Sequence, residues 1–291
     1  MNTDNPVYIR FSGITLRLKP AAPVSFDEDI LSLQCEASDV VDTEYEIRPL
    51  HIPLCPASSP VFDNNGTIIY RYDEGWLRIY PLLIAEDGCQ VACLLCPDGK
   101  NVMYYPAAMW DYYTKPLRCV PYLALELLLL HRDAFLQHSS VVAYNGQAVL
   151  FSGPSSVGKS TQADLWHKYL GADIINGDRC VIMKNREGFY GGGSPLAGSS
   201  RIYRSEQSPI AGIILLEQSP ENRIHQCFAD ALPGLLSQTL VNSWDTAFMD
   251  RLSHLYQELL ESVPVYRLRC RPDLDSVKTA FRAVFRKEPP L

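Results

Sequence analysis

The sequence lacks a basic tract, a low-complexity stretch, an internal repeat and any hydrophobic run long enough to cross a bilayer. Its 33 Asp and Glu outnumber its 26 Lys and Arg, which gives a formal net charge of -7. Neutralisation of phosphates dominates the affinity of proteins for duplex nucleic acid, so this composition argues against a nucleic-acid partner. The longest apolar run, residues 123–130, contains Glu126 and is far shorter than the ~20 residues of a transmembrane helix. We therefore expect neither nucleic acid nor a membrane as a partner.

The amino-terminal residues show no basic segment followed by an apolar run, so no signal peptide is expected. Nine cysteines, an odd number, are scattered along the chain, and in a protein without an export signal they are interpreted as reduced thiols. These two features predict a cytoplasmic protein. With 47% apolar and 20% charged residues in 291, the chain is typical of a globular protein and long enough for two domains.

Residues 1–115 predict a smaller β-rich domain. Residues 67–81 and 90–105 each contain two strand-like segments around a turn, which is typical of β-hairpins. This part carries no motif with evident chemistry, so the role we expect for it is recognition of a partner or substrate. The second domain is expected over residues 116–291, beginning with a helix at 121–135 and containing a helical stretch over 228–261.

Residues 153–160 match the pattern Gly-x-x-x-x-Gly-Lys-Ser in full, with an apolar strand before them and a helix predicted over 159–170. Glycine allows main-chain N–H groups to wrap closely around a polyanion, and the helix N-terminus adds partial positive charge. Lys159 would reach the β- and γ-phosphates, and the Ser160 hydroxyl would ligate Mg²⁺. The pattern predicts an ATP- or GTP-binding loop formed by Gly153, Pro154, Ser155, Ser156, Val157, Gly158, Lys159, Ser160 and Thr161.

A predicted hairpin directly before this loop places a histidine beside it. The Asn-Gly dipeptide at 145–146 suits a two-residue type I′ turn, so Tyr144 would pair with Gln147. His138 would then lie opposite Gly153, where its ring could act as an acid/base or contact phosphate. The alternative is a histidine that merely ends a strand, because a slip of one residue would turn the ring to the other face.

Residues 138–161 and 174–182 resemble the catalytic domain of HPr kinase/phosphorylase, a bacterial protein-serine kinase distantly similar to phosphoenolpyruvate carboxykinase. The spacing of His138, Gly153 and Lys159 is that of the family, and the resemblance extends over about residues 130–290. It implies an α/β fold: a P-loop domain with a mixed sheet, preceded here by the smaller β-rich domain. It also implies ATP (or GTP) and Mg²⁺ as cofactors, and hence a phosphotransferase.

The resemblance also implies roles for individual residues. Lys159 and Ser160 would hold the nucleotide and the metal. Asp178 looks like the carboxylate that takes the proton of the acceptor hydroxyl or holds Mg²⁺ with Ser160, and His138 looks like its acid/base partner. Arg179 stands where the family carries a second acid, and the family's Arg-Gly-x-Gly-Ile segment is not recognisable at 205–212.

The chain is therefore more similar to divergent relatives associated with peptide modification. This implies a kinase that phosphorylates a hydroxyl, such as a serine of a peptide or small protein, and it is compatible with a homo-oligomer. Two alternatives stay open. The protein could bind nucleotide and recognise a peptide without transferring phosphate, or it could phosphorylate a small molecule.

Three other features of the sequence have both a functional and a structural explanation. The glycine-rich residues 191–193 could form a loop whose amides hold phosphate, or a solvent turn, and Arg201 and Arg204 could neutralise phosphate. Glu217 could be the metal-holding acid of a conventional ATPase, but the resemblance favours Asp178. Spacing of the kind Cys-x-x-x-Cys-x-x-Cys is known from iron–sulfur sites, but the strand-like surroundings favour core thiols for Cys89, Cys93 and Cys96.

Overall fold

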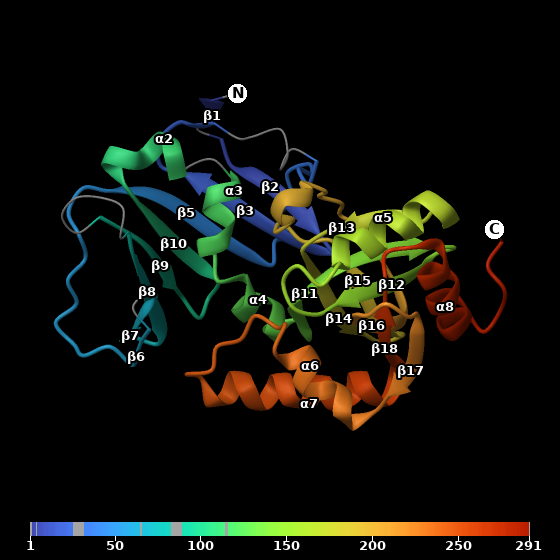
Figure 1. Ribbon diagram of the computed structural model, residues 1–291. Helices are drawn as coiled ribbons and strands as arrows, with labels where there is room; N and C mark the ends of the chain where they lie inside the picture. Colours follow the sequence, from blue (N-terminus) through green and yellow to red (C-terminus); the bar gives the residue numbers. More distant parts are fainter. Residues whose placement is uncertain are drawn as a thin grey trace. The chain divides into compact units, whose positions relative to one another are not determined.

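The structure is a computed structural model of the chain and describes residues 2–3, 5–25, 32–64, 66–82, 89–113 and 116–290. It is a mixed α/β structure with two eight-stranded sheets and an additional two-stranded pair (Figure 1). The chain forms two compact units, one of residues 1–10 and 14–125 and the other of 11–13 and 126–291. Within the described residues, no helix combines the length and apolarity needed to cross a membrane.

The first unit is built on a sheet in which β3–β5 and β5–β10 are parallel pairs. Both strand pairs predicted from the sequence are confirmed, with β7 and β8 around residues 73–74 and β9 and β10 around residues 96–99. Short helices follow the sheet. In order across it, the strands are β2 (Val7–Phe11), β3 (Ile14–Pro20), β5 (Thr43–Leu50), β10 (Lys100–Pro106), β9 (Gln90–Leu95), β8 (Gly75–Pro81), β7 (Ile68–Tyr72) and β6 (Phe62–Asp63).

The second unit contains a mixed sheet in which β12 pairs with β11 on one side and with β16 on the other. The pairs β12–β16 and β16–β18 are parallel, so the carboxyl ends of these three strands lie at one edge. In order, the strands are β12 (Gln147–Ser152), β11 (Ala134–Tyr144), β14 (Arg179–Asn185), β15 (Gly188–Gly192), β16 (Gln207–Gln218), β18 (Val265–Cys270) and β17 (Arg223–Cys227), with β13 (Asp173–Asn176) beside β11.

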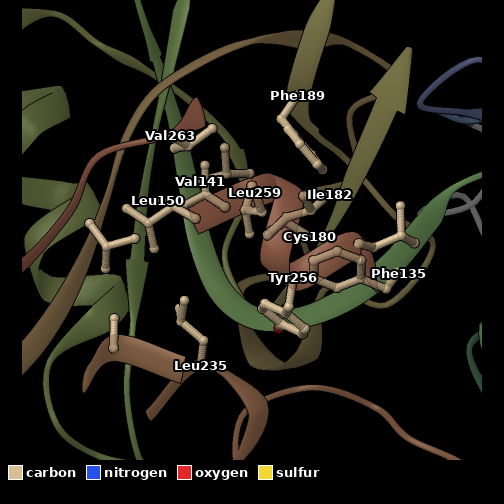
Figure 2. Close-up of a cluster of buried hydrophobic side chains, with 14 of the residues drawn as sticks. Phe135, Val141, Leu150, Cys180, Ile182, Phe189, Leu235, Tyr256, Leu259 and Val263 are labelled. Carbon is tan, nitrogen blue, oxygen red and sulfur yellow. The ribbon is translucent and has the colours of Figure 1, made fainter. Parts of the chain in front are cut away.

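Successive side chains along these strands point to opposite faces of the sheet and pack into two separate hydrophobic cores. Val141 and Leu150 pack with helices α6 (Leu232–Leu236) and α7 (Thr246–Ser262), in the cluster drawn in Figure 2. Val142 and Phe151 point the other way and pack with α5 (Lys159–Leu170) and α8 (Leu274–Phe285). Burial of each such side chain contributes about 1.5–3 kcal/mol, so the two layers of helices fix both faces of the sheet.

The hairpin before the 153–160 loop has the predicted register. Residues 145 and 146 have φ of 48° and 74°, as a type I′ turn requires, and Tyr144 pairs with Gln147. The ladder runs to the pair Ser139–Ser152, so His138 and Gly153 follow directly beyond its last pair. A slip of one residue does not occur.

Two predicted helices have different bounds in the structure. Helix α4 spans only Leu125–His131 rather than 121–135, because Ala124 and Asp133 adopt left-handed φ values of 50° and 53° on either side of it. The helical segment expected over 228–261 is interrupted between α6 and α7. The periodicity of the leucines therefore predicts which side of each helix is buried, but it does not predict the residues at which the helix begins and ends.

The glycines at 191–193 do not form the predicted loop. Gly191 and Gly192 lie within β15, and Gly193 follows it. A Cβ at Gly193 would lie 1.7 Å from the carbonyl oxygen of Arg204, and one at Gly191 would lie 2.8 Å from Leu150 Cδ1. Glycine is required here because neighbouring segments approach closely, which explains the cluster without a phosphate contact.

We expect Gly193→Ala to destabilise the protein by about 3 kcal/mol, because the added methyl group can be accommodated only by a backbone shift. Thermal or urea denaturation measures the change. Gly66→Ala is the matched control, since its Cβ would meet nothing nearer than 3.8 Å. Equal stabilities of the two variants would contradict the close approach at Gly193.

Candidate functional site

The 153–160 loop connects β12 to the first turn of α5. Gly153 and Gly158 have φ of 145° and 114°, which only glycine adopts without strain. A Cβ on Gly153 would also come within 3.1 Å of Val157 Cγ1 and 3.3 Å of the Leu216 carbonyl oxygen. No side chain caps the start of α5 at Gly158, so the first N–H groups of this 12-residue helix are open to an anion.

Lys159 is almost fully buried, with 7% of its surface exposed. Its Nζ donates hydrogen bonds to the carbonyl oxygens of Gly153 (2.9 Å) and Pro154 (3.1 Å) in its own loop. Burial lowers the pKa of this ammonium group below its usual value, an effect that the nearby Asp178 carboxylate partly offsets. The loop thus holds a cation that is poorly compensated in its surroundings and is suited to a polyanion.

His138 of β11 and Asp178 of the turn between β13 and β14 come together. His138 is the last residue of β11 to pair with β14, and its Nε2 lies 3.2 Å from Asp178 Oδ1. The hydrogen bond from His138 is the largest cause that lowers the pKa of Asp178, and the positive charges of Arg179 and Lys159 act in the same direction. Asp178 is therefore held as a carboxylate at neutral pH, with one oxygen engaged by the imidazole.

The turn that carries Asp178 is fixed by a buried asparagine. Asn176 Oδ1 accepts hydrogen bonds from the backbone N–H groups of Asp178 and Arg179, both at 2.9 Å, and its Nδ2 donates to the Ser194 carbonyl at 3.2 Å. Gly198 lies against the carboxylate, since a Cβ there would be 2.8 Å from Asp178 Cγ. The sequence patterns did not single out Asn176 or Gly198, although Asn-Gly at 176–177 is itself a turn signal.

His138, Lys159 and Asp178 line one small cleft of about 280 Å³. Ser160 also reaches it, and its Oγ donates to the Gly177 carbonyl oxygen at 3.3 Å. The structure thus brings together most of the residues singled out from the sequence. The cleft is lined by His138, Ser155, Ser156, Gly158, Lys159, Ser160, Thr161, Gly177, Asp178 and Ser199.

The remaining loop residues, Gly153, Pro154 and Val157, line a neighbouring cavity of about 670 Å³ that also contains Glu217. Arg267 and Arg269 approach the two Glu217 oxygens at 2.6 and 2.9 Å, and their hydrogen bonds, that of Arg267 first, lower its pKa. Both oxygens of the Glu217 carboxylate are thus paired with guanidinium groups, and Glu217 does not line the cleft of Asp178.

Other sequence candidates lie elsewhere. Neither Arg201 nor Arg204 lines the cleft, and Arg204 forms an ion pair with Asp173 at 3.2 Å. Cys93 is fully buried within β9. In the part of the chain that the structure describes, no three His, Cys, Asp or Glu side chains are grouped as ligands of a metal ion.

Comparisons with known proteins give a distant structural similarity. No protein-family model matches the sequence, and no curated protein matches it. Among solved structures, the chain is similar to the Hpr(Ser) kinase/phosphatase from Coxiella burnetii, with 12% sequence identity. The alignment covers 52% of this chain and 88% of that chain at a TM-score of 0.31.

We expect His138→Ala to raise the pKa of Asp178 towards its ordinary value, because the largest cause of its depression is lost. A carboxyl whose pKa is depressed in the folded state contributes stability above its unfolded pKa of about 3.9, and this contribution is lost as the pH falls. The acid unfolding midpoint of His138→Ala should therefore lie at higher pH than that of the wild type. Carboxyl NMR titration measures the pKa directly, and an unchanged value would show that the imidazole does not act on Asp178.

Proposed function

We propose that this protein is a kinase that transfers a phosphoryl group from ATP, or GTP, to a hydroxyl, in the first instance a serine of a peptide or small protein. One observation carries this proposal: a single cleft of about 280 Å³ holds an uncapped helix N-terminus, a buried ammonium group and an imidazole–carboxylate pair. The first two suit a polyphosphate, and the third suits the activation of a hydroxyl.

Nucleotide binding is assigned to the 153–160 loop. Open N–H groups at the start of α5 would receive phosphate oxygens. Lys159 would exchange its hydrogen bonds with the loop carbonyls for bonds to the β- and γ-phosphates, which supply the negative charge that the loop itself lacks.

The cleft also offers donors that fit Mg²⁺. The Ser160 hydroxyl and the Asp178 carboxylate are oxygen ligands of the kind Mg²⁺ prefers, and both line the cleft. Ser160 would hold the ion together with phosphate oxygens and water, and Asp178 would be a ligand only where it does not take the proton of the acceptor. Bound there, Mg²⁺ would neutralise charge on the phosphates.

Asp178 is assigned as the group that receives the proton of the acceptor. The acceptor oxygen forms a bond to the γ-phosphorus while the bond from that phosphorus to the β,γ-bridging oxygen breaks, and ADP or GDP leaves. The proton of the acceptor hydroxyl passes to the free oxygen of the Asp178 carboxylate. His138 keeps the carboxylate oriented through its hydrogen bond to the other oxygen. Residues 1–115, which carry no catalytic motif, are assigned to recognition of the acceptor.

A second function, nucleotide binding without transfer, is favoured by one observation. Arg179 stands where the resembled family carries a second acid, and its Nε lies 3.9 Å from Asp178 Oδ2. A cation at this distance weakens the carboxylate as a base while leaving the phosphate-binding loop intact. The two functions differ in whether a phosphorylated product forms.

The test is incubation with ATP or GTP, Mg²⁺ and candidate peptides, followed by mass spectrometry. Phosphotransfer adds one phosphate, about 80 Da, to the acceptor. We expect Lys159→Ala to lose nucleotide binding, and Asp178→Asn to retain binding but lose transfer by a factor of about 10²–10⁴.

Glu217→Gln is the matched control, because Glu217 borders the loop but not the cleft. It should retain transfer. Loss of transfer in Glu217→Gln together with full transfer in Asp178→Asn would move the catalytic carboxylate to Glu217. Nucleotide binding without any modified peptide would instead support the second function.

A further inference from the structure

A second cavity, of about 590 Å³, borders the 153–160 loop. Ser156, Gly158 and Thr161 line both this cavity and the cleft of Asp178, so the two spaces meet at the N-terminus of α5. Neither His138 nor Asp178 belongs to the walls of this cavity. A molecule with its phosphates on the helix N-terminus could therefore extend into the cavity without approaching the imidazole–carboxylate pair.

The cavity lies at the carboxyl edge of three parallel strands. Its walls come from the loop after β12, from the first turn of α5, from residues 218–220 at the end of β16 and from residues 270–272 at the end of β18. In open α/β sheets, ligands bind in the crevice outside the carboxyl ends of the strands. A volume of about 590 Å³ also falls within the range of small-molecule sites.

One wall contains a buried polar atom without a partner. Gln162 is 2% exposed, and its Nε2 donates to Ser276 Oγ at 3.0 Å and to Cys270 Sγ at 3.4 Å. Its Oε1 has no hydrogen-bond partner among the described residues. A buried acceptor without a donor costs free energy, and Gln162 lines the cavity, so a ligand N–H or O–H group that reaches this enclosed atom from the cavity would satisfy it.

The other walls are held in place before any ligand enters. Arg271 forms an ion pair with Asp273, and the backbone N–H of Arg271 donates to Asn222 Oδ1 at 3.0 Å. Gln218 Nε2 donates to the Ser156 carbonyl oxygen at 3.0 Å and so ties the loop after β16 to the 153–160 loop. The ion pair with Asp273 orients the planar guanidinium of Arg271, whose side chain is 61% exposed and on which an aromatic ring can stack.

We propose that this cavity binds the nucleoside half of the nucleotide, with the base against Arg271 and an exocyclic amino group of the base donating to Gln162. The assignment rests on the proposed function, since it requires the phosphates to lie on the 153–160 loop. This assignment sets the direction of the bound nucleotide, because the base would lie beyond the end of β18 and the γ-phosphate would lie beside Asp178. The base thus lies on the side of the helix N-terminus opposite to the reacting phosphate.

Isothermal titration calorimetry with ATP, GTP and inorganic tripolyphosphate, each with Mg²⁺, tests the site. We expect the better of the two nucleotides to bind wild type at least ~10-fold more tightly than tripolyphosphate. Arg271→Ala should weaken that nucleotide about 3- to 30-fold and leave tripolyphosphate unchanged. Arg223→Ala is the matched control, because this exposed arginine pairs with Glu221 and lines neither space.

The outcomes separate this site from the proposed function. Equal binding of nucleotide and tripolyphosphate, or equal weakening of both by Arg271→Ala, would overturn the nucleoside site and leave the phosphate loop standing. Binding of neither ligand by the wild type would overturn the proposed function itself.

Gln162 is tested by ITP, which carries neither the 6-amino group of ATP nor the 2-amino group of GTP. ITP should bind the wild type about 3- to 10-fold more weakly than the preferred nucleotide, and Gln162→Met should abolish this difference. If circular dichroism shows that Gln162→Met is unfolded, the comparison of nucleotides on the wild type decides. Equal binding of ITP and the preferred nucleotide by the wild type would remove Gln162 from the site.

Discussion

The parallel pairing of β12 with β16 determines where the functional groups of the second unit lie. It directs the carboxyl ends of β12, β16 and β18 to one edge, and the segments at these ends line the cavity beside the N-terminus of α5. Hydrophobic packing on both faces holds this arrangement, because α5 and α8 cover one face and α6 and α7 cover the other. A polyanion site built from main-chain N–H groups needs this rigidity, since such groups cannot move to follow their ligand.

Positive charge predominates around the cleft although the chain as a whole is acidic. A desolvated ammonium at Lys159 and the guanidinium of Arg179 face one carboxylate, and His138 holds that carboxylate in its ionised form. The carboxylate of Glu217, which also lies near the loop, forms ion pairs with Arg267 and Arg269. The cleft therefore favours an anionic ligand despite the net charge of -7, because the nearest charges dominate in a partly desolvated site.

A buried hydrogen-bond network positions the segment that carries His138. The Gln137 side chain donates to Ser152 Oγ and to the Leu235 carbonyl, and it accepts from Tyr256 OH and Thr239 Oγ1. All hydrogen-bonding groups of the Gln137 side chain have partners. A buried polar network that is fully satisfied stiffens the structure, whereas an unpaired buried group would cost free energy of folding. The network joins β11, the end of β12 and the segment after α6. Gln137 directly precedes His138, and Ser152 directly precedes the 153–160 loop, so the network holds the start of both.

The local patterns of the sequence were sufficient for the loop, for α5 and for the hairpin register, because a Gly-x-x-x-x-Gly-Lys-Ser run and an Asn-Gly turn impose their geometry through backbone conformation alone. Strand β17 was not predicted from the sequence, because its mostly exposed residues show no hydrophobic periodicity. The glycines of β15 were predicted as a loop, but they are required because a neighbouring segment packs closely against them. The approach of Asp178 to His138, the burial of Lys159 and the cavity beside Gln162 depend on contacts between residues far apart in sequence. Only the folded sheet could decide these, because burial and distance are properties of the packed chain, whereas turn chemistry is a property of neighbouring residues.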